Sequence, residues 1–325
     1  MGYLGLPAQF CTKMYVSRVP VMHTATFFIT TARSGTQWIC NSLRNVFGDL
    51  LAVEHEPIKY AYAPKHCLRN PGALAALRTH STVRQHLDGI HRTLKDRPYV
   101  EVGFPAFAAA PLLFEEFGSH LRLVHLSRHP LRAAASIVTH RWFDPRERPD
   151  IVADVALTPM DRGVRLHHYA DRWPQMNPFE KALFNWTEVH LYGLEVREQS
   201  SIPVLRVRFE DLLTQKVAGL KFLDFLDLPQ RPEWDAAATT IVDNFQKKTE
   251  NKVDWSKTRT LPEMAELAEA FGYDLEVVSE RTLRSRYDQS LAEKTGRRLK
   301  RSVQRIATFC GPARPTITDK DQRSH

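Results

Sequence analysis

A short segment near the N-terminus combines the residue types that bind an anion. Residues 28–43 read FITTARSGTQWICNSL: an apolar run, a turn of small residues, and then apolar positions at helical spacing. In a strand–turn–helix unit the backbone N–H groups that open the helix point into the turn, and the helix dipole favours negative charge there. Arg33 adds a planar guanidinium suited to phosphate or sulfate oxygens, and Ser34 and Thr36 add hydroxyl donors. The segment therefore predicts a phosphate-binding loop.

The same loop departs from the pattern of nucleoside triphosphatases. It has one glycine, Gly35, and no lysine at the position that GxxxxGK[ST] requires. The later strands do not end in a clear apolar run followed by an aspartate, so a carboxylate for Mg²⁺ is not evident. A P-loop nucleotide kinase or triphosphatase stays open as an alternative. So does an ordinary strand-to-helix turn that needs only the backbone freedom of Gly35.

A second segment has the residue types for another anion site. LRLVHLSR, residues 121–128, reads as a strand that ends in Arg128, and the following helix opens with Pro130. Ser136 lies eight residues after Arg128, about two turns into that helix. A cation at a strand end and a hydroxyl on the next helix can hold one phosphate from two sides.

Strand and helix patterns alternate along the chain. Strands are expected at 26–31, 50–55, 97–104, 121–128 and 202–210, and helices at 35–47, 79–94, 107–117, 130–140, 181–198 and 214–226. Such alternation predicts an α/β fold with a mostly parallel sheet flanked by helices. We expect a single domain over residues 26–280, an N-terminal extension over 1–25 and a basic helical tail over 281–325.

The two anion-binding segments together resemble the PAPS-dependent sulfotransferase family. In that family a loop of the SGTxW type binds the 5′-phosphosulfate, and an arginine and a serine in an R(N/H)P…S arrangement bind the 3′-phosphate. The resemblance implies a 5′-phosphosulfate site at Arg33, Ser34, Gly35, Thr36, Gln37 and Trp38, and a 3′-phosphate site at Arg128 and Ser136.

Three later segments match the same family in the same order. RFEDLL (208–213) resembles its YEDL strand end, FQKKTENKVDWSK (245–257) resembles its basic nucleotide-closing loop, and LPEMAELAEAFGYDL (261–275) resembles its helix ending in LGY. The resemblance covers most of residues 26–275. It implies that Lys247, Lys248, Asn251 and Lys252 order over the 3′-phosphate; a solvated lysine run is the alternative.

The resemblance also implies the chemistry. PAPS (3′-phosphoadenosine 5′-phosphosulfate) would donate a sulfuryl group and leave adenosine 3′,5′-bisphosphate. A sulfuryl group carries less negative charge than a phosphoryl group, so protein cations and backbone donors can stabilise its transfer without a metal. Arg33 stands where many relatives have a lysine. Because a guanidinium does not readily give up a proton, we expect Arg33 to act by its charge alone.

The acceptor hydroxyl or amine needs a general base. One branch of the family uses a histidine at the end of a KTH strand, but the corresponding strand here reads YVEVGF, with Gly103 at that position. Other branches, which act on carbohydrate or peptide hydroxyls, use a glutamate just after the second strand. That region reads VEHEPIKY, so Glu56 is the first candidate, His55 and Glu54 follow, and Glu101 is a fourth. A solvated strand end is the alternative for EHE.

Residues 141–180 are Pro-rich and lack a regular pattern. A long irregular segment in a compact domain is often a binding loop, so we expect acceptor contacts here. The acceptor, whether a carbohydrate, lipid, peptide or small molecule, is not identified by the sequence. An irregular segment whose aromatic residues belong to the core is the alternative. The aromatic residues concerned are Trp142, Phe143, Tyr169, Trp173 and Phe179.

The charge distribution argues against a nucleic-acid-binding body. The chain has 325 residues and a net charge of +8. Residues 281–325 contain twelve Lys and Arg and four Asp and Glu, which is the whole excess. The spacing of Leu283, Tyr287 and Leu291 favours a basic amphipathic helix that meets a membrane surface or an acidic partner, or that packs on the body. A non-catalytic protein that binds anions or nucleic acid on this scaffold is a further alternative.

Targeting and metal signals are absent from the sequence. No apolar run reaches the ~18 residues that span a bilayer, and no secretory signal pattern opens the chain. The four cysteines form no CxxC pair, and no histidine spacing typical of a metal site occurs. We therefore expect a cytoplasmic protein with reduced thiols and no metal.

Overall fold

The computed structural model describes residues 22–239, 248–249 and 253–288. Contacts divide the chain into two compact units, each assembled from several segments. The sheet unit comprises Met1–Arg128, Met160–Arg165 and Glu188–Ile241, and the helical unit comprises His129–Pro159, Leu166–Thr187 and Val242–His325. The domain bounds at residues 26 and 280 stay a prediction.

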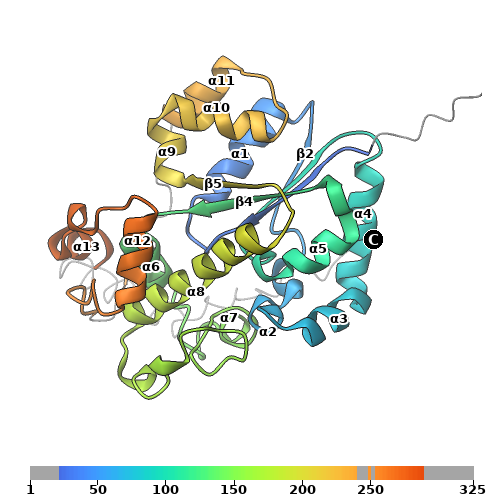
Figure 1. Ribbon diagram of the computed structural model, residues 1–325. Helices are drawn as coiled ribbons and strands as arrows, with labels where there is room; N and C mark the ends of the chain where they lie inside the picture. Colours follow the sequence, from blue (N-terminus) through green and yellow to red (C-terminus); the bar gives the residue numbers. More distant parts are fainter. Residues whose placement is uncertain (1–21, 240–247, 250–252, 289–325) are drawn as a thin grey trace, which may run out of the picture. The chain divides into compact units, whose positions relative to one another are not determined.

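Five parallel strands form the centre of the sheet unit (Figure 1). They are β1 (Ala25–Ile29), β2 (Ala52–His55), β3 (Tyr99–Val102), β4 (Leu121–Ser127) and β5 (Val204–Arg208), in the order β2-β3-β1-β4-β5. All four strand pairs are parallel, and Ala25 of β1 lies opposite Tyr99 of β3 on one side and Leu121 of β4 on the other. The predicted α/β fold with a parallel sheet is therefore confirmed.

Helices cover both faces of this sheet. On one face lie α1 (Thr36–Phe47), α9 (Phe209–Thr214), α10 (Lys216–Phe225) and α11 (Pro232–Thr239), and on the other lies α5 (Ala110–Phe117) (Figure 1). The unit also contains α2 (Pro64–Cys67), α3 (Pro71–Thr79) and α4 (Ser81–Thr93). The alternation of side chains along β1 serves both faces. Phe28 packs edge-on against Phe222 of α10, whereas Phe27 stacks on Phe117 of α5.

A core cluster lies between the sheet and α1, α10 and α11. Phe28, Leu43, Phe47 and Phe222 are almost fully buried there, and Trp234 of α11 stacks on Phe222 with ring centroids 5.7 Å apart. Strands covered on both faces read as near-continuous apolar runs, which is why β1 and β4 stood out in the sequence. This core fixes the carboxyl ends of the strands, where the predicted site residues lie.

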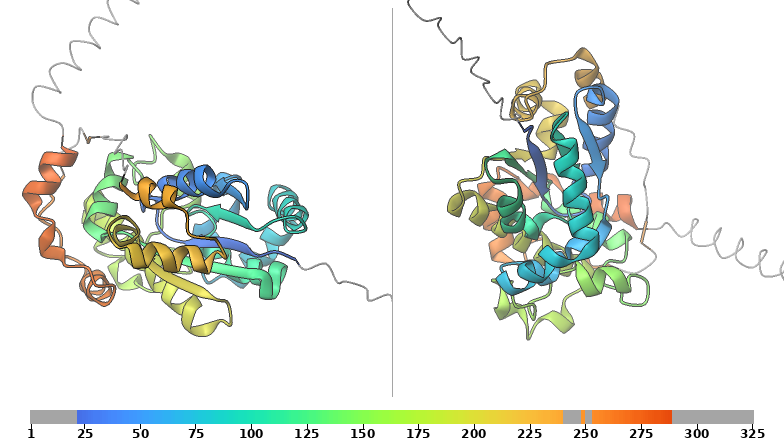
Figure 2. Two further views of the ribbon diagram at one scale, coloured as in Figure 1. Left: turned by 90° about the horizontal axis from the view of Figure 1, so that it is seen from above. Right: turned by 90° about the vertical axis from the view of Figure 1, so that its right-hand side faces the viewer.

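The helical unit contains Ser136, one of the two residues predicted to bind the 3′-phosphate, and begins one residue after the other, Arg128. Its helices are α6 (Pro130–Thr139), α7 (Pro149–Asp154), α12 (Pro262–Ala270), α13 (Glu280–Tyr287) and α8 (Pro178–Gln199) as far as Thr187. α12 and α13 follow one another along the chain (Figure 2). α12 ends at a left-handed Gly272, with φ of +78°, and Phe271 packs on Trp186 of α8. The segment predicted to be irregular, residues 141–180, contains α7, two single-turn 3-10 helices (His167–Tyr169 and Trp173–Gln175) and the start of α8.

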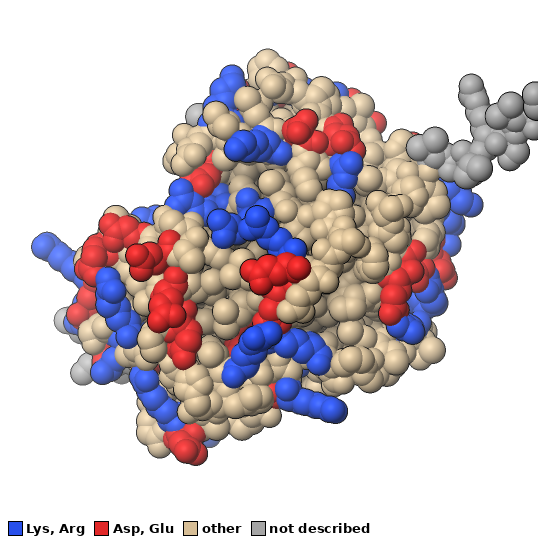
Figure 3. Space-filling view, viewed as in Figure 1, with Lys and Arg blue, Asp and Glu red and all other residues tan. Residues whose placement is uncertain are grey.

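The described part of the predicted basic tail forms α13. Leu283 and Tyr287 are buried and its arginines are exposed, as expected for a helix that packs one stripe on the body. Leu291 and the rest of the tail lie outside the described residues. On the face drawn in Figure 3, acidic and basic side chains are interspersed, which agrees with a charge-balanced body. Among the described helices, none is long and apolar enough to cross a membrane.

Candidate active site

The predicted phosphate-binding loop connects β1 to α1. Two of its residues adopt the left-handed backbone conformation, Arg33 with φ of +67° and Gly35 with φ of +89°. The hydroxyl oxygens of Thr31 and Ser34 are 3.0 Å apart, and both side chains are buried. The Ser34 hydroxyl therefore bonds within the loop and shapes it, and a contact between this hydroxyl and a ligand stays a prediction.

Gly35 is required by its conformation and by its neighbour. A Cβ atom at this position would lie only 2.1 Å from Cε2 of Phe209, the first residue of α9. Phe209 belongs to the RFEDLL segment, so two parts of the sequence resemblance meet in space. Within that segment, the ring of Phe209 is what contacts the loop. A side chain at position 35 would displace either the ring or the loop.

The start of α1 has the features of an anion site. Gly35 caps the helix without a side-chain hydrogen bond, and the first turn contains no acidic residue. The first backbone N–H groups of a helix have no partner within the helix, and the dipole is positive at this end. Arg33 supplies a full positive charge two residues before the cap. The residues present therefore fit a phosphate or sulfate group.

Arg128 follows β4 and lies beside the loop. Its Nη1 donates a hydrogen bond to the carbonyl oxygen of Arg33 over 2.7 Å, and its guanidinium is 5.8 Å from the ring centroid of Phe209. Ser136 lies on α6 and is 8% exposed. Arg128 belongs to the sheet unit and Ser136 to the helical unit, so the two-sided grip on a 3′-phosphate stays a prediction.

Trp38 packs next to the same loop. Its ring meets Phe209 and Trp234 with centroid distances of 5.8 Å in each case, and its Nε1 donates to the carbonyl oxygen of Ala237 over 3.4 Å. The neighbouring Gln37 is exposed on the first turn of α1. Trp38 thus joins α1 to α9 and α11, and its contact with a nucleotide stays a prediction.

Glu56 follows β2 directly and has an unusual environment. Its backbone is left-handed, with φ of +49°, and its side chain is 22% exposed. Burial raises the pKa of Glu56 to about 7; a backbone hydrogen bond from Phe104 lowers it, the charge of Glu101 raises it further, and the charge of Arg33 lowers it. The Glu56 carboxylate therefore interacts electrostatically with the loop cation. A carboxyl group with this pKa exchanges its proton near neutral pH.

Gly103 makes the space for Glu56. A Cβ atom at position 103 would lie 2.5 Å from Cγ of Glu56 and 3.4 Å from its backbone nitrogen. In the sequence, Gly103 indicates only the loss of a strand-end histidine. In the structure a side chain at 103 and the side chain of Glu56 would compete for the same volume, so the glycine and the glutamate fit as a pair.

His55 links Glu56 to the loop. Its Nε2 lies 3.2 Å from Oγ1 of Thr36, the first residue of α1, and 3.7 Å from Oε1 of Glu56. Burial and then the charge of Arg44 lower the pKa of His55, so the ring is neutral near pH 7. The structure thus places two of the base candidates, His55 and Glu56, beside the predicted phosphosulfate loop.

The other two candidates lie in a different network. Glu101 is 2% exposed and its Oε2 is 2.7 Å from Nε2 of His86. Tyr99 donates from its hydroxyl to Glu54 over 2.8 Å and to Glu101 over 3.3 Å. Burial raises the pKa of Glu101, and its pairing with His86 opposes this effect. Glu101 and Glu54 thus both accept a hydrogen bond from Tyr99, and Glu101 also pairs with His86.

The remaining predicted residues lie in the helical unit or outside the described residues. Lys247, Asn251 and Lys252 are outside the described residues, and Lys248 is partly buried. No group of three or more His, Cys, Asp or Glu side chains that could hold a metal occurs in the part of the chain that the structure describes.

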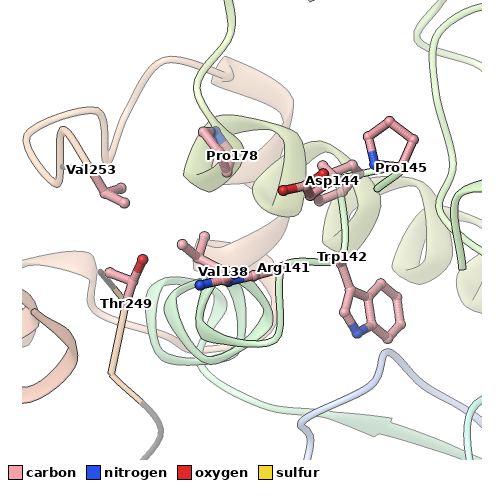
Figure 4. A pocket seen from close by; sticks show the side chains of 9 residues that line it. Val138, Arg141, Trp142, Asp144, Pro145, Pro178, Thr249 and Val253 are labelled. Atoms are coloured by element: carbon pink, nitrogen blue, oxygen red, sulfur yellow. The ribbon is translucent and has the colours of Figure 1, made fainter. Parts of the chain in front are cut away.

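Most of the aromatic residues proposed for acceptor contacts are buried in the helical unit. Tyr169, Trp173 and Phe179 are 6%, 8% and 0% exposed, and the Tyr169 hydroxyl donates to Glu263 over 2.7 Å. Trp142, which is 4% exposed, and Phe143 border a cavity of about 240 Å³, whose polar lining includes Arg141, Asp144 and Thr249 (Figure 4). Acceptor contacts in this segment stay a prediction.

Among the comparisons with known proteins, only the search of solved structures found matches. No family model matches the chain, and no curated protein sequence matches it. Matching structures include the sulfotransferase domain from the curacin biosynthetic pathway, with 16% identity, 78% of this chain and 99% of that chain covered, and a TM-score of 0.43. The sulfotransferase from Alicyclobacillus acidocaldarius is 17% identical, with 79% of this chain and 99% of that chain covered and a TM-score of 0.43. Mouse sulfotransferase SULT7A1, solved with PAP, is 12% identical, with 81% of this chain and 88% of that chain covered and a TM-score of 0.43.

Proposed function

We propose that this protein transfers a sulfuryl group from PAPS to a hydroxyl or amine of an acceptor. One observation carries the proposal. Glu56, a carboxyl group whose pKa is about 7, interacts electrostatically with Arg33, the cation of an anion-binding loop. A base poised near neutral pH beside a phosphosulfate site is what transfer to a hydroxyl requires. The motif resemblance supplies the identity of the donor.

The loop would hold the donor's phosphosulfate. PAPS supplies a sulfuryl group already activated by its bond to the 5′-phosphate. The N–H groups at the start of α1 and the guanidinium of Arg33 would bind its oxygens. As the bond between sulfur and the bridging oxygen breaks, negative charge grows on the departing phosphate, and Arg33 would stabilise it. Arg128 would support this role, because its hydrogen bond to the Arg33 carbonyl holds the loop backbone.

Glu56 would activate the acceptor. Its ionised carboxylate takes the proton of the acceptor hydroxyl while the acceptor oxygen forms a new bond to sulfur. The electron pair of the old sulfur–oxygen bond stays with the phosphate, so the products are the sulfated acceptor and adenosine 3′,5′-bisphosphate. The backbone hydrogen bond from Phe104 and the charge of Arg33 favour the ionised form, whereas burial and Glu101 favour the protonated form. These opposing effects leave the group able to accept a proton near pH 7.

A thermal-shift comparison tests the donor. A ligand that binds only the folded chain raises its melting temperature. We expect adenosine 3′,5′-bisphosphate to raise the melting temperature, ATP with Mg²⁺ to leave it unchanged, and Arg128→Ala to remove the shift. Stabilisation by ATP with Mg²⁺ alone would instead favour a P-loop kinase or triphosphatase. Tight, steeply salt-dependent binding of nucleic acid with no response to the bisphosphate would favour the non-catalytic alternative.

Transfer itself is tested with labelled PAPS and a panel of acceptors. The panel should contain a carbohydrate, a lipid headgroup, a tyrosine peptide and a small phenol. We expect label to pass to one class, and Glu56→Gln to abolish this while the bisphosphate still raises the melting temperature. Normal turnover by Glu56→Gln would overturn the assignment of the base.

A further inference from the structure

The end of α13 contacts the segment that resembles the nucleotide-closing loop at Thr249 and at Trp255, on either side of residues 250–252, which lie outside the described residues. The N–H of Thr249 donates to the carbonyl oxygen of Tyr287 over 2.7 Å, and Thr249 pairs with Asp288 in a parallel β-bridge. On the other side, Nε1 of Trp255 donates to Oδ1 of Asp288 over 2.8 Å. We call Tyr287 and Asp288 the C-terminal bracket.

The same bracket contacts the helix that carries Ser136. The hydroxyl of Tyr287 donates to the carbonyl oxygen of Arg132 over 3.4 Å, and α13 packs against α6. Arg132 lies in the first turn of α6, and Ser136 follows four residues later, one turn along the same helix. Two adjacent residues therefore join three places: Thr249, Trp255 and α6.

These contacts are buried, so they constrain the backbone. Trp255 is 0%, Leu283 1%, Tyr287 6% and Thr249 6% exposed, and the rings of Trp255 and Tyr287 lie 6.1 Å apart. A buried donor that loses its partner leaves an unsatisfied group, which makes the hydrogen bond from Trp255 to Asp288 costly to break. The bracket is thus a fixed connection within the helical unit.

We infer that Tyr287 and Asp288 are positioning residues for the 3′-phosphate of the nucleotide. Lys248 directly precedes Thr249, and Ser136 lies one turn from Arg132, so the bracket sets the placement of these two predicted phosphate-binding side chains relative to one another. This inference rests on the proposed function. It gives α13 a role in selecting nucleotides that carry a 3′-phosphate over those that lack it, although neither bracket residue needs to contact the ligand.

Two ligands separate this role from a general structural one. Adenosine 3′,5′-bisphosphate and adenosine 5′-monophosphate differ only in the 3′-phosphate. We expect Asp288→Ala to lower the affinity for the bisphosphate by about tenfold, a factor typical of a lost buried hydrogen bond. The affinity for the monophosphate should be unchanged. Isothermal titration calorimetry on the full chain measures both dissociation constants. Glu280→Ala is the matched control, because it removes an exposed carboxylate from the same helix and should change neither constant.

Trp255→Phe tests the same hydrogen bond from its other end, and it serves if Asp288→Ala does not fold. The two variants should lower the affinity for the bisphosphate equally. The double variant should bind it no more weakly than either single variant, because both substitutions remove the same hydrogen bond. An equal loss of affinity for both nucleotides would overturn the inference and leave the proposed function standing. So would normal bisphosphate affinity in both variants, if Ser136→Ala loses that affinity. Wild-type protein that does not bind the bisphosphate would remove both.

Discussion

The side chain of Glu56 fills the place that a side chain at Gly103 would take. A Cβ atom at 103 would approach Cγ of Glu56 to 2.5 Å, although 47 positions separate the two residues in the chain. Strand register explains the meeting. His55 at the end of β2 lies opposite Val102 at the end of β3, and Glu56 and Gly103 are the residues that follow these two strand ends. The glycine therefore fixes where the candidate base can lie.

Gly103→Ala should lower turnover more than it lowers nucleotide affinity. The added methyl group must displace Glu56, and a misplaced general base costs about 10²-fold or more in rate. Steady-state kinetics with PAPS and bisphosphate titration separate the two effects. Gly89→Ala is a matched control, since a Cβ atom there meets nothing nearer than Nη2 of Arg92 at 3.7 Å. Unchanged kcat in Gly103→Ala would show that Glu56 is not positioned by this contact.

The pH dependence of transfer should report the ionisation of Glu56. Because the base acts when ionised and burial raises its pKa to about 7, kcat/KM should rise with pH and level off above about pH 7. The residual rate of Glu56→Gln should lack this rise. A profile of the mutant identical in shape to that of the wild type would assign the titration to another group.

The same pKa predicts a stability effect of defined sign. Between the unfolded value of about 4.3 and the folded value, the folded chain holds the Glu56 proton and the unfolded chain has lost it. The stability that this proton provides is complete below the lower value and is lost as pH rises through the higher one. Urea unfolding of the wild type and Glu56→Gln should therefore diverge between about pH 4 and pH 7, with the mutant relatively more stable at pH 7. A constant difference would contradict the raised pKa.

Gly35→Ala should damage the phosphosulfate loop. The substitution places a Cβ atom on Phe209 and strains a backbone with φ of +89°, so we expect a loss of about 1–3 kcal/mol in unfolding free energy. The melting-temperature shift with the bisphosphate should also disappear. Phe209→Ala removes the clash and keeps the strain, although the loss of this buried ring is itself destabilising. A double-mutant cycle should therefore show that Gly35→Ala costs less unfolding free energy in the Phe209→Ala background than in the wild type. An equal cost in both backgrounds would mean that backbone conformation alone sets it.

Arg33 should be replaceable by lysine and not by alanine. Its assigned role is to place positive charge at the departing phosphate, which lysine can also do. We expect Arg33→Ala to lower kcat by about 10²–10³-fold, a loss typical of one electrostatic stabiliser, and Arg33→Lys to keep most of the activity. Single-turnover measurements at saturating PAPS isolate this step. A normal rate in Arg33→Ala would remove the residue from the chemistry.

The fold class followed from patterns that are local in the chain. Apolar runs alternating with helical spacing predicted each of the five strands and α1, α4, α5, α6, α8 and α10, because buried parallel strands and amphipathic helices leave those periods in any sequence. The helix α3 was not predicted, although Asn70 accepts a hydrogen bond from the N–H of Ala73 and Pro71 occupies the first turn. That cap was a local signal and could have been used.

The sequence by itself determined which residue types stand at the strand ends: Arg33 after β1, Glu56 after β2 and Arg128 after β4. Only the tertiary structure decided that Glu56 lies against Gly103, that Gly35 lies against Phe209, and that Glu101 pairs with His86 instead. It also showed that Tyr169 and Trp173 are core residues. The physical reason is that residue type and period are properties of a short segment. Which side chains share a volume depends on strand register and packing between segments far apart in the chain.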